Sequence, residues 1–123
     1  MRTTPEAFTH YLAAWNEPDP DRIRGHLDVA VGEHVAFVDP ANTAMCPDRL
    51  EALIREAHEG LPAAEYVRTS GIDGHNGRYR YRWEVRIDGE TVAAGMDFTT
   101  VDASGRLQRI DGFFGDFPDR EGE

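Results

Sequence analysis

The chain has 123 residues and a formal net charge of −10, which fit one acidic domain and argue against DNA or RNA as a partner. All 13 basic residues are arginine, so lysine Schiff-base chemistry and a lysine-containing phosphate loop are excluded. The single cysteine, Cys46, excludes an internal disulfide, and no apolar run is long enough to span a membrane. The first five residues do not resemble a signal peptide, so we expect a cytoplasmic protein.

The first half of the chain predicts three helices. Residues 4–6, Thr-Pro-Glu, are typical of a helix start, and aromatic side chains follow at helical spacing up to Trp15. A second helix is predicted to begin at Asp19-Pro20, and a third to begin at Pro47 and end at Gly60. Each predicted helix has one apolar face, so we expect all three to cover the same face of a sheet.

The second half of the chain predicts mainly strands. One short buried strand, residues 35–38, precedes the third helix and ends at Asp39-Pro40. Beyond the third helix the apolar residues recur with a period of two, and the strands predicted there are residues 66–70, 78–87, 91–101 and 106–115. A glycine-rich turn is predicted at residues 71–77 and a hairpin turn at Asp88-Gly89. Helices followed by long antiparallel strands indicate an α+β fold. Residues 1–123 are expected to form one domain, with a loose polar tail at 118–123.

The last two predicted strands carry apolar residues on both faces. Met96 and Phe98 lie on one face of their predicted strand and Val101 on the other. In the last strand, Phe113 lies on the opposite face from Ile110 and Phe114. A sheet with one wet face normally alternates apolar and polar residues. We therefore expect a homodimer that covers the outer face of the sheet, and scattered surface apolar residues are the alternative.

Three polar side chains are candidates for chemistry at the edge of the core. Asp39 follows four apolar residues, where partial burial would make it a usable general base, or Asp-Pro simply begins a turn. Asp97 lies inside a strand, where Asp is disfavoured. If Asp97 faces inward, its protonated carboxyl could donate to an oxyanion, but the neighbouring apolar residues favour an outward position. Tyr11 lies on the apolar face of the first helix, and its hydroxyl reaches either a cavity or the surface.

The remaining polar residues give weaker signals. His75 lies in a turn that is either solvated or at the rim of a pocket. The five histidines show no metal-ligand spacing, so we expect no metal, and the glycine-rich turn lacks the spacing of a dinucleotide-binding loop. The row of arginines at residues 78–86 is interpreted as a solvated or interfacial face.

The order of the predicted elements, two helices, a strand, a helix and four strands, resembles the nuclear-transport-factor-2-like superfamily. The similarity is greatest to its SnoaL-like polyketide cyclases and ketosteroid isomerases, and it extends from about residue 8 to residue 117. The segments that carry it are residues 11–16, 37–40, 95–98, 105–107 and 112–115. The resemblance implies a cone-shaped, curved, mostly antiparallel sheet, also called cystatin-like, whose concave face is covered by three helices.

The resemblance also implies a role for each of the three polar candidates. Asp39 corresponds to the general base, Tyr11 to the phenol of the oxyanion hole, and Asp97 to its protonated carboxyl group. Asp97 would then point into the cone. The side chains predicted to bind substrate around it are Trp15, Leu53, Tyr81, Trp83, Ile110, Phe114 and His75.

The function implied by the resemblance is a cofactor-independent isomerase or cyclase. It would remove a proton next to a carbonyl group of a small hydrophobic, polyketide- or steroid-like substrate. Leu27 and Ile54 stand where the isomerases have hydrogen-bonding tyrosines, which disfavours steroid isomerisation itself. The alternatives are a non-catalytic dimeric ligand-binding module and an epoxide-hydrolase-like enzyme. The epoxide-hydrolase-like reaction would need an Asp–Arg–Asp arrangement, and Arg82 is predicted on the face of the sheet that points away from the cavity.

Overall fold

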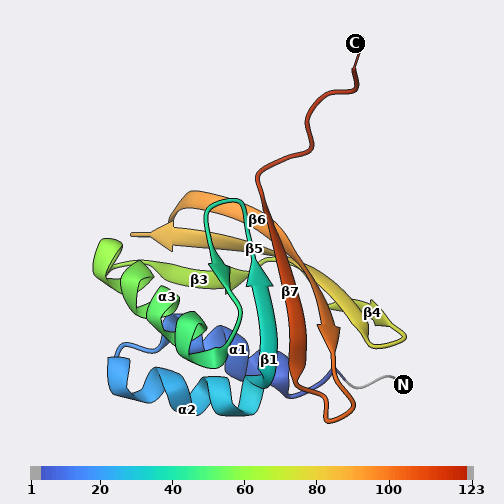
Figure 1. Ribbon diagram of the computed structural model, residues 1–123. Coiled ribbons are helices and arrows are strands. Elements are labelled where there is room, and N and C mark those ends of the chain that lie inside the picture. The colour runs from blue at the N-terminus through green and yellow to red at the C-terminus, as the bar shows by residue number, and fades with distance from the viewer. Residues whose placement is uncertain (1–3, 122–123) are drawn as a thin grey trace.

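A computed structural model describes residues 4–121 of the chain as three helices packed against one curved sheet (Figure 1). The helices are α1 (Ala7–Asn16), α2 (Pro20–Ala30) and α3 (Pro47–Gly60). The strands are β1 (Val31–Val38), β2 (Thr43–Ala44), β3 (Glu65–Arg68), β4 (Asp73–His75), β5 (Arg78–Ile87), β6 (Glu90–Val101) and β7 (Leu107–Phe114). The predicted α+β fold, with a mostly antiparallel sheet, is confirmed.

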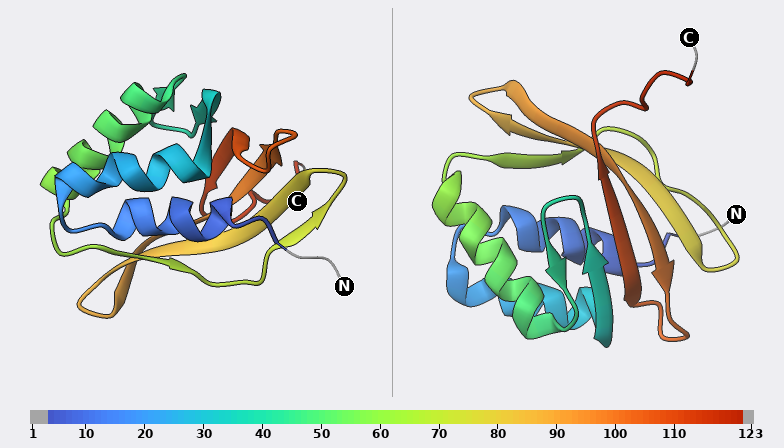
Figure 2. Two further views of the ribbon diagram at one scale, coloured as in Figure 1. Left: turned by 90° about the horizontal axis from the view of Figure 1, so that it is seen from below. Right: turned by 45° about the horizontal axis from the view of Figure 1, so that its top comes forward.

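The sheet has the strand order β2-β1-β7-β6-β5-β3. The short strand β4 pairs with the first residues of β5, 78–80, whereas β3 pairs with residues 83–86 of β5. All neighbouring strands are antiparallel except β1 and β7, which run parallel. The sheet curls without closing, and Figure 2 shows the helices together on its concave side, with α1 lying against the strands. The parallel β1–β7 pair brings two segments far apart in the sequence to the same point of the sheet.

The helices lie close to their predicted positions. Asp19 caps α2, because its Oδ1 accepts the backbone N–H of Asp21 at 3.0 Å. The start of α1 was predicted too early: the helix begins at Ala7, and Glu6 at its N-cap makes no side-chain cap bond. The predicted cap residue, Thr4, lies outside the helix.

Three strand predictions were incomplete. β1 begins at Val31, directly after α2, and not at residue 35, since its register shifts between Val31 and Ala36 and residues 33 and 34 are exposed. The short strand β2 and the strand β4, inside the predicted glycine-rich turn, were missed. The predicted hairpin at Asp88-Gly89 is confirmed, and both of its residues have positive φ, 53° and 81°.

The core fills the space between the helices and the concave face of the sheet. Phe8 on α1 contacts the rings of Tyr79 and Tyr81 edge-on, with centroids 5.2 and 5.8 Å away. The largest fully buried side chains are Phe8, Ile23, Leu27, Val35, Leu50, Ile54, Leu107 and Ile110. Because α1 covers only part of the concave face, the strands beyond its aromatic side chains are left to line a cavity.

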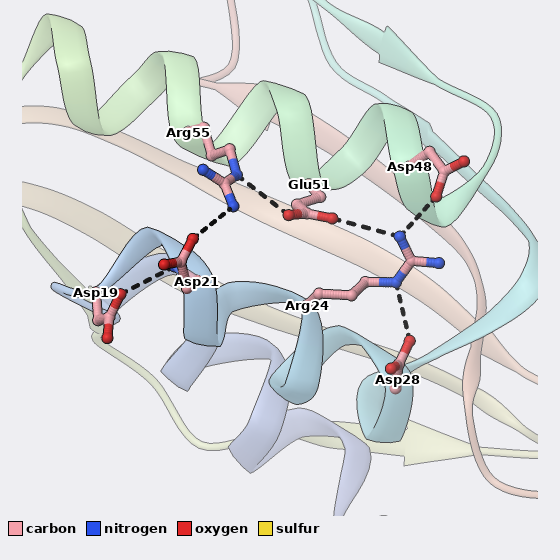
Figure 3. A network of polar contacts seen from close by, with 7 residues as sticks. All are labelled: Asp19, Asp21, Arg24, Asp28, Asp48, Glu51 and Arg55. Atoms are coloured by element: carbon pink, nitrogen blue, oxygen red, sulfur yellow. Dashed lines mark hydrogen bonds and ion pairs between the residues drawn. The ribbon is translucent and has the colours of Figure 1, made fainter.

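A network of ion pairs joins α2 to α3 on the side away from the sheet (Figure 3). Arg24 on α2 contacts Asp28 at 2.9 Å, Asp48 at 2.6 Å and Glu51 at 3.3 Å. Arg55 on α3 contacts Glu51 at 3.1 Å and Asp21 at 3.6 Å. Exposed pairs of this kind contribute at most about 1 kcal/mol each, so the network orients the two helices more than it stabilises them.

The chain leaves the sheet after Gly115, and residues 116–121 extend away from it (Figure 1). Phe117 in this segment is 85% exposed. Residues 1–3, the beginning of the segment compared with a signal peptide, and residues 122–123, the end of the predicted tail, lie outside the described residues. No helix within residues 4–121 is long and apolar enough to cross a membrane.

Candidate active site

A mostly apolar cavity of about 230 Å³ opens on the concave side of the sheet. Its lining comes from α1, α3, the loop after β1, and strands β1, β3, β5, β6 and β7. The volume is below the roughly 300–1,000 Å³ of pockets for drug-sized ligands, which favours a small ligand. The predicted residues in the lining are Tyr11, Trp15, Asp39, Tyr81, Trp83, Asp97 and Phe114.

Three predicted substrate-binding residues do not line this cavity. Ile110 is completely buried in the core. Leu53 packs against the core from α3. His75 lies on β4, which pairs with the other end of β5, and there its Nδ1 meets the side-chain amide of Asn76 at 3.0 Å. Only some residues of the apolar face of α3 and of the concave face of the sheet line the cavity, and the others pack in the core. Knowing the face on which a residue lies was therefore not enough to predict that it lines the cavity.

Asp97 faces inward from β6 and is only 8% exposed. The hydroxyl of Tyr81 donates to its Oδ2 at 2.8 Å, and the indole Nε1 of Trp83 donates to its Oδ1 at 3.0 Å. The outward position favoured by alternation is wrong, because residues 92, 94, 96 and 98 form an apolar outer face and not the core. Alternation alone could not tell the two faces apart.

Burial raises the pKa of Asp97 to about 6. The hydrogen bonds from Tyr81 and Trp83 favour the carboxylate and partly oppose this rise, and the negative charge of Asp39 adds to it. A carboxyl group with this pKa exchanges its proton near neutrality, which suits acid–base chemistry.

Asp39 and Asp97 approach each other across Gly112 on β7. Gly112 is the cross-strand partner of Asp97, and a Cβ atom at this position would lie 3.2 Å from both the Cβ of Asp39 and the Oδ1 of Asp97. The parallel β1–β7 pair, with Val38 opposite Asp111, brings Asp39 to the same place. Glycine at residue 112 therefore leaves the space in which the two carboxyl groups face the cavity.

Asp39 is held by the turn that follows β1. Its Oδ1 accepts the backbone N–H groups of Ala41 at 2.9 Å and Asn42 at 2.7 Å. Within residues 4–121, no hydrogen bond of the protein reaches its Oδ2. The turn interpretation of Asp-Pro is therefore correct, and the same turn fixes the carboxyl group with one oxygen uncommitted at the cavity.

Tyr11 lines the cavity from α1 and is 5% exposed. Burial raises its pKa well above the ordinary value of tyrosine, and the negative charges of Asp97 and Asp39 raise it further. A hydrogen bond with the side chain of Trp15 lowers the pKa and opposes this rise only in part. Tyr11 therefore stays a neutral phenol, which can donate a hydrogen bond into the cavity.

Several polar residues of the cavity were missed in the sequence, and Asn42 and Glu84 are two of them. Tyr81, predicted only as a contact for substrate, holds Asp97, and burial raises its own pKa well above the ordinary value. Arg68 on β3 also lines the cavity. In the pairing of β3 with β5, Tyr66 lies opposite Val85 and Arg68 lies opposite Trp83. Residues 66 and 68 share one face of their strand, so the aromatic Tyr66 was the signal that could have placed Arg68 on the inner face.

Two further observations concern the alternative reaction and the possible metal ligands. Arg82 is exposed on the outer face of β5, as predicted, so it cannot complete an epoxide-hydrolase-like arrangement in the cavity. Among residues 4–121, no group of three or more His, Cys, Asp or Glu side chains is arranged to hold a metal ion.

Solved structures share the fold of this chain. No protein-family model matches it, and a comparison with curated proteins finds no match. A protein from Methylobium petroleophilum with a cystatin-like fold and unknown function is 17% identical over 96% of this chain and 78% of its own, with a TM-score of 0.73. A candidate SnoaL-like polyketide cyclase from Jannaschia is 12% identical over 93% of this chain and 89% of its own, with a TM-score of 0.69.

These similarities define a nuclear-transport-factor-2-like, cystatin-like fold. A candidate isomerase of the SnoaL-like family from Agrobacterium tumefaciens is more similar in sequence. It is 32% identical over 89% of this chain and 95% of its own, with a TM-score of 0.84. The chain therefore belongs to the SnoaL-like family, and the resemblance found in its sequence is confirmed.

Proposed function

We propose that the protein is a cofactor-independent isomerase or cyclase that enolises a small hydrophobic carbonyl compound. The observation that supports this function best is the pair of carboxyl groups, Asp39 and Asp97, that meet across Gly112 in an apolar cavity containing Tyr11. The descriptions of the Agrobacterium and Jannaschia proteins as candidate isomerase and cyclase point to the same class of reaction.

In the proposed reaction, Oδ2 of Asp39 removes a proton from the carbon next to the carbonyl group. The electron pair of the broken C–H bond moves toward the carbonyl oxygen, where Tyr11 and protonated Asp97 donate hydrogen bonds to the developing negative charge. Each oxygen of Asp97 already accepts one hydrogen bond, Oδ1 from the Trp83 indole and Oδ2 from the Tyr81 hydroxyl, and these two contacts orient the carboxyl group for the donation. Asp39 then returns the proton to another carbon. Alternatively, the enolate carbon attacks a second carbonyl carbon and closes a ring, and the alkoxide oxygen formed there takes the proton back from Asp39.

Proton exchange with solvent tests this proposal without knowledge of the natural substrate. In D₂O, wild-type protein is expected to catalyse exchange of the α protons of small aryl ketones such as methyl 4-oxo-4-phenylbutanoate, followed by NMR. Tyr11→Phe removes one donor to the oxyanion and is expected to lower the exchange rate by a factor of about 10²–10³.

The matched control for this experiment is Tyr79→Phe. Tyr79 packs against the same core cluster as Tyr11 but does not line the cavity. An equal effect of both variants would contradict a special role for the Tyr11 hydroxyl. Binding of the ketones without any exchange would instead support the non-catalytic ligand-binding module.

We also propose a homodimer formed through the outer face of the sheet. Phe98 and Phe113 are 37% and 58% exposed there, and their rings contact each other edge-on at 5.7 Å. Met96 lies opposite Phe113 in the β6–β7 pair. An exposed aromatic cluster on a sheet face that no helix covers is typical of a surface that is covered by a partner.

Phe113→Glu is expected to convert the dimer to a monomer, because it places a charge at the centre of this apolar cluster. Light scattering coupled to size-exclusion chromatography measures the change in mass. Met45→Glu is the control, since Met45 is 56% exposed in the loop after β2. A monomeric wild type at micromolar concentration would contradict the proposal. The cytoplasmic location and the absence of a nucleic-acid partner stay predictions.

A further inference from the structure

Among residues 4–121, Arg68 is the single arginine in the lining of the cavity. Its guanidinium carbon lies 5.7 Å from the centre of the Tyr81 ring, and its Nη1 donates a long hydrogen bond of 3.4 Å to the backbone oxygen of Phe8. Asn16 fixes the strand that carries it, by accepting from the Tyr66 N–H and donating to the Tyr66 C=O, each at 2.8 Å. The guanidinium is therefore held in place by α1 and the face of Tyr81.

The charge of Arg68 is not neutralised by the protein. Within the described part of the chain, no carboxylate lies within 4.0 Å of its guanidinium, although the sequence contains 23 Asp and Glu residues. Arg24, Arg55, Arg80, Arg86 and Arg109 all make such contacts. Arg49, Arg78, Arg82 and Arg106 make no such contact with residues 4–121, but they are exposed to water, whereas Arg68 is partly buried. A partly buried arginine with most of its N–H groups uncommitted is suited to bind an anion.

The position of Arg68 also provides access to water. Besides the cavity, Arg68 lines an open groove between α1 and β3, which contains Leu12, Asn16 and Ser70. A carboxylate bound at this boundary would keep part of its hydration, so the cost of taking its charge into the cavity would be reduced. The apolar part of the same ligand would lie in the cavity.

We infer that Arg68 binds a carboxylate of the substrate, so that the substrate is a small keto acid. This inference rests on the proposed enolisation, because it assigns the two ends of one ligand. Tyr81 connects the two positions: its ring lies against Arg68 and its hydroxyl meets Asp97 at 2.8 Å. A carboxylate on Arg68 therefore places the reacting carbonyl group of a γ-keto acid toward Asp97 and Tyr11. The carboxylate of Asp39 repels an anion elsewhere in the lining and favours this single orientation.

A pair of probes that differ only in charge tests the inference. They are 4-oxo-4-phenylbutanoate and its methyl ester, and their binding is measured by quenching of Trp15 and Trp83, the two tryptophans of the chain, which both line the cavity. Wild-type protein is expected to bind the acid about tenfold or more tightly than the ester, since hydrogen bonds between charged groups are strong. Arg68→Gln is expected to remove this preference and to leave binding of the ester unchanged.

Two further variants make the result specific. Arg82→Gln, which removes the same charge from the outer face, is expected to keep the preference for the acid. Asp39→Asn is expected to keep it as well while losing α-proton exchange, so failure of catalysis and failure of anion binding are distinguished. Equal affinity of the wild type for acid and ester, or a preference that survives Arg68→Gln, would overturn the inference.

If Arg68→Gln also loses binding of the ester, the cavity itself has changed, and Arg68→Lys decides the question. Lysine keeps a positive charge on this strand position, without the planar fork with which arginine lies over Tyr81. A preference for the acid retained by this variant supports the inference, and a folded Arg68→Lys protein without any preference contradicts it.

Discussion

Replacing Asp39 by asparagine is expected to lower the rate of α-proton exchange by a factor of about 10²–10⁴, the usual contribution of a general base. Asparagine has nearly the shape of aspartate but cannot accept the substrate proton at the position of Oδ2. The variant is measured in D₂O with the same ketone probes as the wild type, under conditions in which the uncatalysed rate is subtracted.

The fold is expected to survive this substitution. The side-chain oxygen of the introduced asparagine can still accept the backbone N–H groups of Ala41 and Asn42, which are the contacts that hold the turn. Asp111→Asn is the matched control, because Asp111 lies on the outer side of the sheet next to Gly112 and pairs with Arg109 at 2.8 Å. Exchange that is equally fast in wild type and Asp39→Asn would remove Asp39 from the mechanism.

The elements that carry this site were predictable where the signal was local. Residues 78–87 alternate along their whole length and form a strand with the predicted bounds, and Asp88-Gly89 forms the predicted turn. The first half of β1 was not predictable in this way. Its exposed residues 33 and 34 and its shifted register hide the apolar positions on either side of them.

The site required information that no single segment contains. Asp39 and Asp97 meet because β1 pairs with β7 in parallel and because residue 112 is glycine, and neither fact follows from the sequence around either acid. The resemblance to a family supplied the inward direction of Asp97, where alternation had favoured the opposite. Arg68 was missed because its strand was predicted without assigning its faces, although Tyr66 two residues earlier lies on the same side.

A second large effect is expected in the pH dependence of stability. Relative to Asp97→Asn, the wild type is expected to lose on the order of 2 kcal/mol of unfolding free energy as the pH rises from about 4 to about 6. The pKa of Asp97 is about 6 in the folded protein, and that of an unfolded aspartate is about 3.9. Below both values the carboxyl group is protonated in both states, so its titration contributes nothing. Between them the unfolded chain loses its proton first, which favours unfolding.

Urea unfolding of both proteins between pH 4 and pH 8 measures this difference. Asparagine keeps an oxygen for the Trp83 indole and offers an amide to the Tyr81 hydroxyl, so the variant preserves the contacts of the neutral acid. Titrating groups that do not interact with Asp97 are shared by both proteins and cancel in the difference. A difference that rises with pH would mean that the donors Tyr81 and Trp83 outweigh burial and hold Asp97 as a carboxylate.

The same titration assigns the role of Asp97 in catalysis. If protonated Asp97 donates to the oxyanion, kcat/KM for proton exchange must fall as the pH rises through the pKa at which the stability difference levels off. If Asp97 were instead the base, kcat/KM would rise through that pKa, and Asp39→Asn would retain activity. If the pH at which the stability difference levels off agrees with the pH at which kcat/KM falls, both measurements report the ionisation of one buried carboxyl group. The proton on Asp97 in the folded protein is then the proton that the reaction requires.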